Sequence, residues 1–121
     1  MGVQSYQDLV VWQKAMEATR LVYLLVRKLP REELFSLSDQ MRRAAVSIPS
    51  NIAEGQARNS TKEFLHFLAI AKGSKAELET QLLLCVKVGY LADTDIKAAM
   101  SLLQEVGKML GALTRTLTTA R

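Results

Sequence analysis

The sequence predicts an all-α protein, folded as an antiparallel up-down-up-down four-helix bundle with a proline-kinked second helix. Three observations lead to this fold class. Apolar residues recur every three or four positions along most of the chain, which is the period of an amphipathic helix. The strict alternation typical of half-buried strands is absent. Only two prolines interrupt 121 residues. No linker, repeat or low-complexity tract divides the chain, so we expect one domain over residues 1–121.

The first helix is predicted from Leu9 to Leu29. Asp8 is its expected N-cap, because an Asp side chain accepts hydrogen bonds from the free N–H groups of a first turn. Pro30 should end the helix. Two neighbouring apolar stripes run along it. One stripe contains Leu9, Trp12, Met16, Thr19, Tyr23 and Val26. The other contains Val11, Ala15, Ala18, Val22, Leu25 and Leu29. Together they exceed what one bundle seam needs, which indicates a further contact.

The second helix should begin near Ser36, as its cap, and continue to about residue 55. Its apolar spacing continues in phase through Pro49, in the series Leu37, Met41, Ala44, Ile48 and Ile52. We therefore predict a kink at Pro49 and not a break. Proline in a helix interior costs about 3 kcal/mol and frees the carbonyl of Ala45, which a Ser hydroxyl or water would satisfy. The bend is either required by packing or an inherited, tolerated feature.

The remaining two helices have clear start and stop signals. Ser60 and Glu63 form a predicted capping box for a third helix that runs to about Val88. Gly89 should then take the left-handed conformation, with Tyr90 folding back toward Cys85. The last helix should start at Asp93 or Thr94. Its apolar stripe is Ile96, Met100, Leu103, Val106, Leu110, Leu113 and Leu117.

A stripe of small polar residues on the second helix predicts a subunit interface. The helical period places one set of residues within a narrow arc, namely Gln40, Arg43, Ser47, Ser50, Asn51, Glu54 and Arg58. Short side chains flank this arc at Val46, Ala53 and Ala57 and would let another helix approach closely. The candidate interface residues are Arg43, Ser47, Ser50, Asn51 and Glu54. The alternative is a solvated face that happens to have short side chains. Gly73 and Ser74 in the third helix also favour close packing against a neighbour.

The charge balance is compatible with nucleic acid, because the formal net charge is +4 and the pI is about 9.4. The candidate phosphate-binding residues are Arg42, Arg43, Arg58, Lys62, Lys72 and Lys75. Four aromatic residues lie at or beside predicted core positions and offer no base-stacking platform, namely Trp12, Tyr23, Phe64 and Phe67. We therefore expect contact with the nucleic-acid backbone and little sequence selectivity. The alternative is a scaffold or adaptor for another protein, in which the positive charge is incidental.

The sequence predicts no catalytic, metal or cofactor site. Glu63 and His66 are spaced as in a di-iron bundle, but such a site needs that unit twice and the chain has one histidine. The single Cys85 lies in an apolar run, which predicts a buried thiol and fits the reducing cytoplasm. No segment is long and apolar enough to predict a membrane span, and no signal peptide is visible.

Three stretches resemble the bacterial four-helix-bundle family encoded in intervening sequences of 23S rRNA genes, also called the ribosomal protein S23 family. They are "YQDLVVWQKAM", "LSDQMRRAAVSIPSNIAEG" and "STKEFLHFLAIAKGSKAELETQL". The most specific block is "SIPSNIAEG", at residues 47 to 55. The family is similar to the accessory variability protein of diversity-generating retroelements, a basic homopentameric barrel that associates with reverse transcriptase and nucleic acid. The resemblance thus implies a homopentamer, with RNA (rRNA) or a reverse-transcriptase-like protein as partner, and supplies no catalytic residues.

Overall fold

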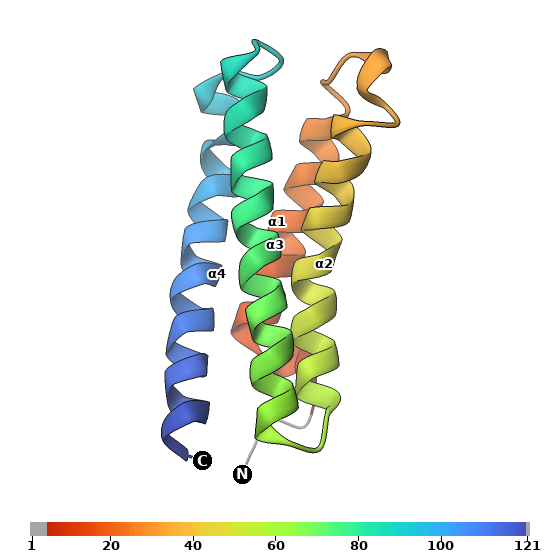
Figure 1. The fold of residues 1–121 in the computed structure, drawn as a ribbon. Helices are drawn as coiled ribbons and strands as arrows, with labels where there is room; N and C mark the ends of the chain where they lie inside the picture. The colour runs from red at the N-terminus through yellow and green to blue at the C-terminus, as the bar shows by residue number, and fades with distance from the viewer. Residues whose placement is uncertain (1–4, 121) are drawn as a thin grey trace.

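The computed structural model describes residues 5–120, and four long helices make up most of them (Figure 1). The helices are α1 (Val10–Val26), α2 (Leu37–Ala57), α3 (Thr61–Lys87) and α4 (Asp93–Ala120), with short 3-10 turns η1 (Tyr6–Asp8) and η2 (Arg31–Glu33) before the first two. Successive helices are antiparallel, and α1 and α3 each pack against both α2 and α4. The described residues contain no strand. The predicted all-α four-helix bundle is confirmed.

The core lies on the shared axis of the bundle and takes one apolar stripe from each helix. Its largest fully buried side chains include Val22, Met41, Ile48, Ile52, Leu68, Leu78, Leu82, Leu103 and Leu110. Of the two stripes predicted on the first helix, the one that contains Ala15 and Val22 is buried. The other stripe is left partly open, because Met16 and Tyr23 are 45% and 43% exposed. Among residues 5–120, one apolar face of α1 therefore has no complete cover.

The predicted start of the first helix is wrong in its cap. Asp8 belongs to η1, and the N-cap of α1 is Leu9, whose side chain makes no capping hydrogen bond. Ser5 caps η1 instead, because its hydroxyl accepts from the Gln7 N–H at 3.1 Å. Leu9 has an extended backbone, so it separates the turn from the helix and moves Asp8 away from the free N–H groups of α1. The helix also ends earlier than predicted, at Val26.

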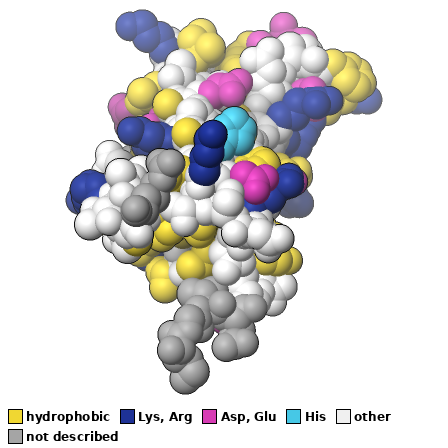
Figure 2. Space-filling model, turned by 60° about the horizontal axis from the view of Figure 1, so that its bottom comes forward, with side chains coloured by type: hydrophobic (Ala, Val, Ile, Leu, Met, Phe, Trp, Pro, Cys, Tyr) yellow, Lys and Arg dark blue, Asp and Glu magenta, His cyan; other side chains and the backbone are white. Residues whose placement is uncertain are grey.

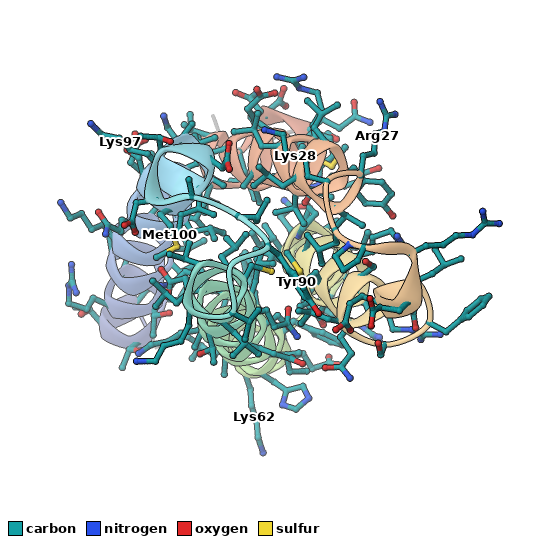
Figure 3. The ribbon with its side chains drawn as sticks, turned by 90° about the horizontal axis from the view of Figure 1, so that it is seen from above. Arg27, Lys28, Lys62, Tyr90, Lys97 and Met100 are labelled. Atoms are coloured by element: carbon teal, nitrogen blue, oxygen red, sulfur yellow. The ribbon has the colours of Figure 1, made fainter. Side chains whose placement is uncertain are left out.

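The start of α2 depends on a carboxylate that precedes it. Ser36 occupies the N-cap but its side chain does not cap the helix. One carboxylate oxygen of Glu33 accepts from the Leu37 N–H at 3.3 Å and from the Ser36 hydroxyl at 2.6 Å. The other accepts from the Tyr90 hydroxyl at 2.7 Å. Glu33 thereby joins the segment between α1 and α2 to the segment between α3 and α4, at the end of the bundle where Tyr90 lies in Figure 3.

These contacts predict a pH window for stability. The hydrogen bonds from Ser36, Tyr90 and the Leu37 N–H lower the pKa of Glu33. The bond to Glu33 raises the pKa of Tyr90, because it requires the protonated phenol. The stability that ionised Glu33 contributes to the folded protein is therefore lost as pH falls through its lowered pKa. The stability that protonated Tyr90 contributes is lost as pH rises through its raised pKa.

The matched variant is Tyr90→Phe. We expect wild type to exceed it in unfolding free energy between about pH 5 and about pH 9, the window inside the ordinary Glu and Tyr pKa values. The difference should shrink at both extremes in urea unfolding followed by circular dichroism. A difference that stays constant from acid to alkali would show that the hydrogen bond does not contribute.

Pro49 lies inside one continuous helix, as predicted from the unbroken apolar phase. The degree of the expected kink stays a prediction. Proline leaves the carbonyl of Ala45 without its helical N–H partner, and Ala45 is fully buried. The Thr19 hydroxyl of α1 lies 3.1 Å from this carbonyl and 2.8 Å from the carbonyl of Ala15. The hydroxyl within hydrogen-bond distance of the Ala45 carbonyl is therefore that of Thr19, on the neighbouring helix, in place of the Ser hydroxyl expected.

This contact predicts that Thr19→Val destabilises the protein by about 1–3 kcal/mol, the cost of an unsatisfied buried polar group. Thr19→Ser keeps the hydroxyl and should cost less. In a Pro49→Ala background the residue at 49 regains an N–H for the carbonyl of Ala45, so Thr19→Val should then cost less than in wild type. A double-mutant cycle by chemical unfolding measures this coupling. Strict additivity would mean that Thr19 does not serve the carbonyl freed by Pro49.

The signals around α3 are confirmed. The Ser60 hydroxyl accepts from the Glu63 N–H at 3.1 Å and donates to the Glu63 carboxylate at the same distance. At the other end, Gly89 has a φ of +89°, and the Tyr90 N–H donates to the Cys85 carbonyl at 2.9 Å. The short connections at both ends therefore fix the antiparallel order of α2, α3 and α4.

Candidate nucleic-acid and subunit interfaces

The predicted polar stripe of α2 divides between two surroundings. Ser47 and Asn51 are half-buried and face α3, where the Ser47 hydroxyl lies 2.7 Å from that of Ser74. The Asn51 amide donates to the Ser47 carbonyl and hydroxyl at 2.7 and 2.9 Å. Ser50 is exposed and lies toward α1. Ser47 and Ser74 are therefore small because α2 and α3 approach closely, a contact within the chain that the sequence reasoning assigned to a second copy.

The charged members of the stripe pair along their own helix. Arg43 donates to Asp39 at 2.9 Å, and Arg58 donates to Glu54 at 2.8 Å. The Arg58 guanidinium also lies over the Phe67 ring, 4.9 Å from its centroid. All of these pairs are largely exposed, so each adds little to stability and leaves the arginines accessible to a partner. The interface at Arg43, Ser47, Ser50, Asn51 and Glu54 stays a prediction.

The six candidate phosphate-binding residues do not form one cluster. Arg42 and Arg43 lie near the start of α2, and Arg58 lies about 24 Å further along at 1.5 Å per residue. Lys62 is near the start of α3 and points away from the bundle (Figure 3). Lys72 is exposed in the middle of α3. The accessible charge is therefore distributed as a line over α2 and α3, with acidic side chains interspersed around the histidine at one end (Figure 2).

Lys75 has a different environment from the other five. Its side chain is only 16% exposed and pairs with Glu79 at 2.9 Å. Its stem lies against α4 at Gly107, where a Cβ would come within 2.8 Å of the Lys75 Cε. A lysine held in this way has little freedom to reach a phosphate. Among the sequence candidates, Lys75 acts as a packing residue between α3 and α4.

An apolar groove lies between α1 and α2, on the side where the first stripe of α1 is open. Its volume is about 430 Å³. The residues along it are Tyr6, Trp12, Met16, Thr19, Tyr23, Val46, Pro49, Ser50 and Ala53. Tyr6 and Trp12 contact edge to face with ring centroids 5.3 Å apart. The small residues predicted on the flank of α2 therefore lie beside exposed aromatic and Met side chains of α1.

The remaining chemical groups of interest are dispersed. His66 is exposed and contacts the Phe67 ring edge to face. The described residues hold no group of three His, Cys, Asp or Glu side chains placed to bind a metal. Burial raises the pKa of the Cys85 thiol, which lies 3.6 Å from the Met41 sulfur. Cys85 is thus a core residue, as predicted.

Sequence reasoning missed two groups of residues at these surfaces. Thr19 was placed in an apolar stripe, and its bond to α2 has no signal within α1 itself. Arg27 and Arg31 flank Pro30 and join Arg42 around a second hollow. The run "RKLPR" was a usable signal, because proline turns the chain between the two arginines.

The fold and these surfaces define the chain as an all-α four-helix-bundle protein. Residues 7–112 match the family of 23S rRNA-intervening sequence proteins. The chain belongs to this family, which confirms the resemblance carried by the "SIPSNIAEG" block.

A solved structure supports the same assignment. The chain is similar to a crystal structure described as a protein with unknown function from the S23 ribosomal protein family of Bacteroides thetaiotaomicron VPI-5482. The two share 27% identity with a TM-score of 0.79, over 86% of this chain and 97% of that chain. No curated protein matches the chain. Among the described residues, no helix is both long and apolar enough to cross a bilayer.

Proposed function

We propose that this protein is a non-enzymatic, oligomeric bundle of the cytoplasm that binds the RNA backbone through basic residues of α2 and α3. The family name links the chain to an intervening sequence of 23S rRNA. The observation that carries the proposal is the exposure of Arg43, Arg58, Lys62 and Lys72 along the same two helices. Lys62 and Lys72 make no ion pair among residues 5–120. Their charge is thus available for phosphate groups.

The test is charge reversal at Lys62 and Lys72. We expect Lys62→Glu combined with Lys72→Glu to weaken binding of a fluorescein-labelled RNA hairpin by about tenfold or more, because two phosphate contacts are replaced by repulsion. Lys97→Glu with Lys108→Glu is the matched control, since both lysines are exposed on α4 and the change in charge is the same. Equal losses in the two variants would show that only net charge matters and that α2 and α3 form no binding face.

The self-association is proposed to use the open groove between α1 and α2. A second copy would cover the exposed apolar surface of Met16 and Val46, which a small monomer seldom leaves open. The likeness to the accessory variability protein favours five copies. In light scattering, we expect Met16→Lys with Val46→Lys to reduce the particle mass, while Leu83→Lys on α3 leaves it unchanged. A monomeric wild-type protein would contradict this assignment.

A second candidate function is a protein adaptor, with a reverse-transcriptase-like protein as one partner. The same groove favours it, since aromatic and Met side chains are enriched at protein interfaces. Two results together would favour the adaptor over the RNA function. The wild-type protein would bind no RNA hairpin at low salt, and the Met16→Lys variant would lose a protein partner that wild type binds.

A further inference from the structure

Three arginines line one hollow where α1 turns into α2. Arg27 follows the last turn of α1, Arg31 lies in η2, and Arg42 projects from the second turn of α2. Figure 3 shows Arg27 at this corner of the bundle. The hollow has a volume of about 550 Å³, within the range of small-molecule sites. The residues that complete it are Tyr23, Val26, Leu29, Pro30, Leu34 and Ser38.

No ion pair among residues 5–120 neutralises the positive charge at this hollow. Arg27, Arg31 and Arg42 make no ion pair among the described residues, and no acidic side chain lines the hollow. Two neighbouring carboxylates are engaged elsewhere, Glu33 with Tyr90 and Asp39 with Arg43, and Glu32 does not line the hollow. Guanidinium groups that share a concave site repel one another, and an anion that binds between them removes this repulsion.

The remaining walls add hydrogen-bonding groups and a ring. Arg42 is held by one bond, from its Nη2 to the Leu34 carbonyl at 3.4 Å, and its other N–H groups stay free for a ligand. Ser38 is only 3% exposed, yet it lines the hollow. The sequence predicts Tyr23 at or beside the core, with no role in stacking. In the structure Tyr23 is 43% exposed, so its ring offers a face to a base.

We propose that this hollow binds the phosphate group of a nucleotide. The guanidinium groups of Arg27, Arg31 and Arg42 are planar, and each can donate two parallel hydrogen bonds to two oxygens of one phosphate. The Tyr23 ring stacks on the base, and the Ser38 hydroxyl donates to a further oxygen. The nucleotide is either part of an RNA strand or free. For a strand, the inference rests on the proposed RNA function and gives that function a defined site.

The experiment is isothermal titration calorimetry with 5′-UMP, with uridine as the ligand that lacks phosphate. We expect wild type to bind 5′-UMP and not uridine. Arg27→Gln with Arg31→Gln should weaken 5′-UMP binding by about tenfold or more, because charged hydrogen bonds to phosphate are removed. Both arginines are exposed, so the fold should persist, which circular dichroism verifies. The matched control is Lys97→Gln with Lys108→Gln on α4, with the same loss of charge and an expected change of less than about twofold.

Competition with the RNA hairpin identifies the source of the nucleotide. Displacement of 5′-UMP by the hairpin assigns the site to an RNA strand, and simultaneous binding of both assigns it to a free nucleotide. Absence of 5′-UMP binding by wild type, or equal affinity in wild type and the double variant, would overturn the proposal. Hairpin binding that is lost in Lys62→Glu with Lys72→Glu would then still support the RNA function. Binding of 5′-UMP without any hairpin binding would reject the RNA function and keep the site.

Discussion

Leu78→Ala should lower the free energy of unfolding by about 2–5 kcal/mol, the cost of removing a large buried side chain and leaving a cavity. Leu78 lies in the middle of α3 and is completely buried. It packs in the one core to which all four helices contribute. A cavity there removes apolar contacts that hold the helices together. Urea unfolding followed by circular dichroism at 222 nm measures the loss.

Leu83→Ala is the control for this prediction. Leu83 lies on the same helix and undergoes the same chemical change, but it is 53% exposed. A substitution at such a position usually changes stability by no more than about 0.5 kcal/mol. Equal costs at positions 78 and 83 would contradict the assignment of core and outer faces on α3.

The second large effect is expected at Gly55, where α2 and α3 approach closely near their connection. A Cβ at this position would lie 2.9 Å from both the Phe64 Cδ1 and the Phe67 Cβ, and 3.3 Å from the Phe64 carbonyl oxygen. Gly55→Val therefore requires the two helices to separate, and overpacking of this kind typically costs about 1–3 kcal/mol or more. Gly55→Ala should cost less, because it adds only the Cβ. The thermal midpoint and the urea midpoint should both fall in the order Gly, Ala, Val.

Gly73 provides the opposite case on α3. Nothing lies within 4 Å of a Cβ placed there, so Gly73→Ala should stabilise the helix by up to about 1 kcal/mol. The sequence predicts close packing against a neighbour at this glycine, and among the described residues no neighbouring atom lies that close. If Gly73→Ala destabilises the assembled protein, a second copy must cover this part of α3.

The sequence was sufficient for the helices because their signals are local and repeated. The stripes predicted on α2 and α4 each recur over about four turns or more, so tertiary packing and helical period agree along these helices. The Ser60 cap and the Gly89 stop each depend on residues a few positions apart. Pro49 was assigned to a helix interior because the apolar phase continued on both sides of it, and the structure has one helix there.

The errors arose where a nearby group competes for the same hydrogen bond or a distant group supplies it. Asp8 has the chemistry of a cap, but the extended Leu9 places it in a separate turn. Ser36 donates its hydroxyl to Glu33, and this carboxylate caps the helix in its place. The Thr19–Ala45 contact joins residues 26 positions apart. No local pattern in α1 or α2 could have revealed it.

The candidate sites were less predictable than the fold, because the fate of a charged side chain depends on its neighbours in space. Lys72 and Lys75 are both lysines of α3, but their surroundings differ. The stem of Lys75 lies against α4, in the space left by the missing side chain of Gly107. Arg27, Arg31 and Arg42 come from three successive elements, and only the turn at Pro30 brings them around one hollow. The net charge of the sequence predicts neither the packing of Lys75 nor the hollow lined by the three arginines.

The salt dependence of RNA binding tests the central claim, that this bundle binds RNA through phosphate contacts. The measurement is the fluorescence anisotropy of the labelled hairpin with wild-type protein, from about 50 to about 200 mM salt. Four exposed basic side chains on α2 and α3, each contacting one phosphate, predict a slope of about −3 to −4 for the logarithm of affinity against the logarithm of salt, counted per subunit. No binding at the lowest salt, or an affinity that does not change over this range, would contradict the account.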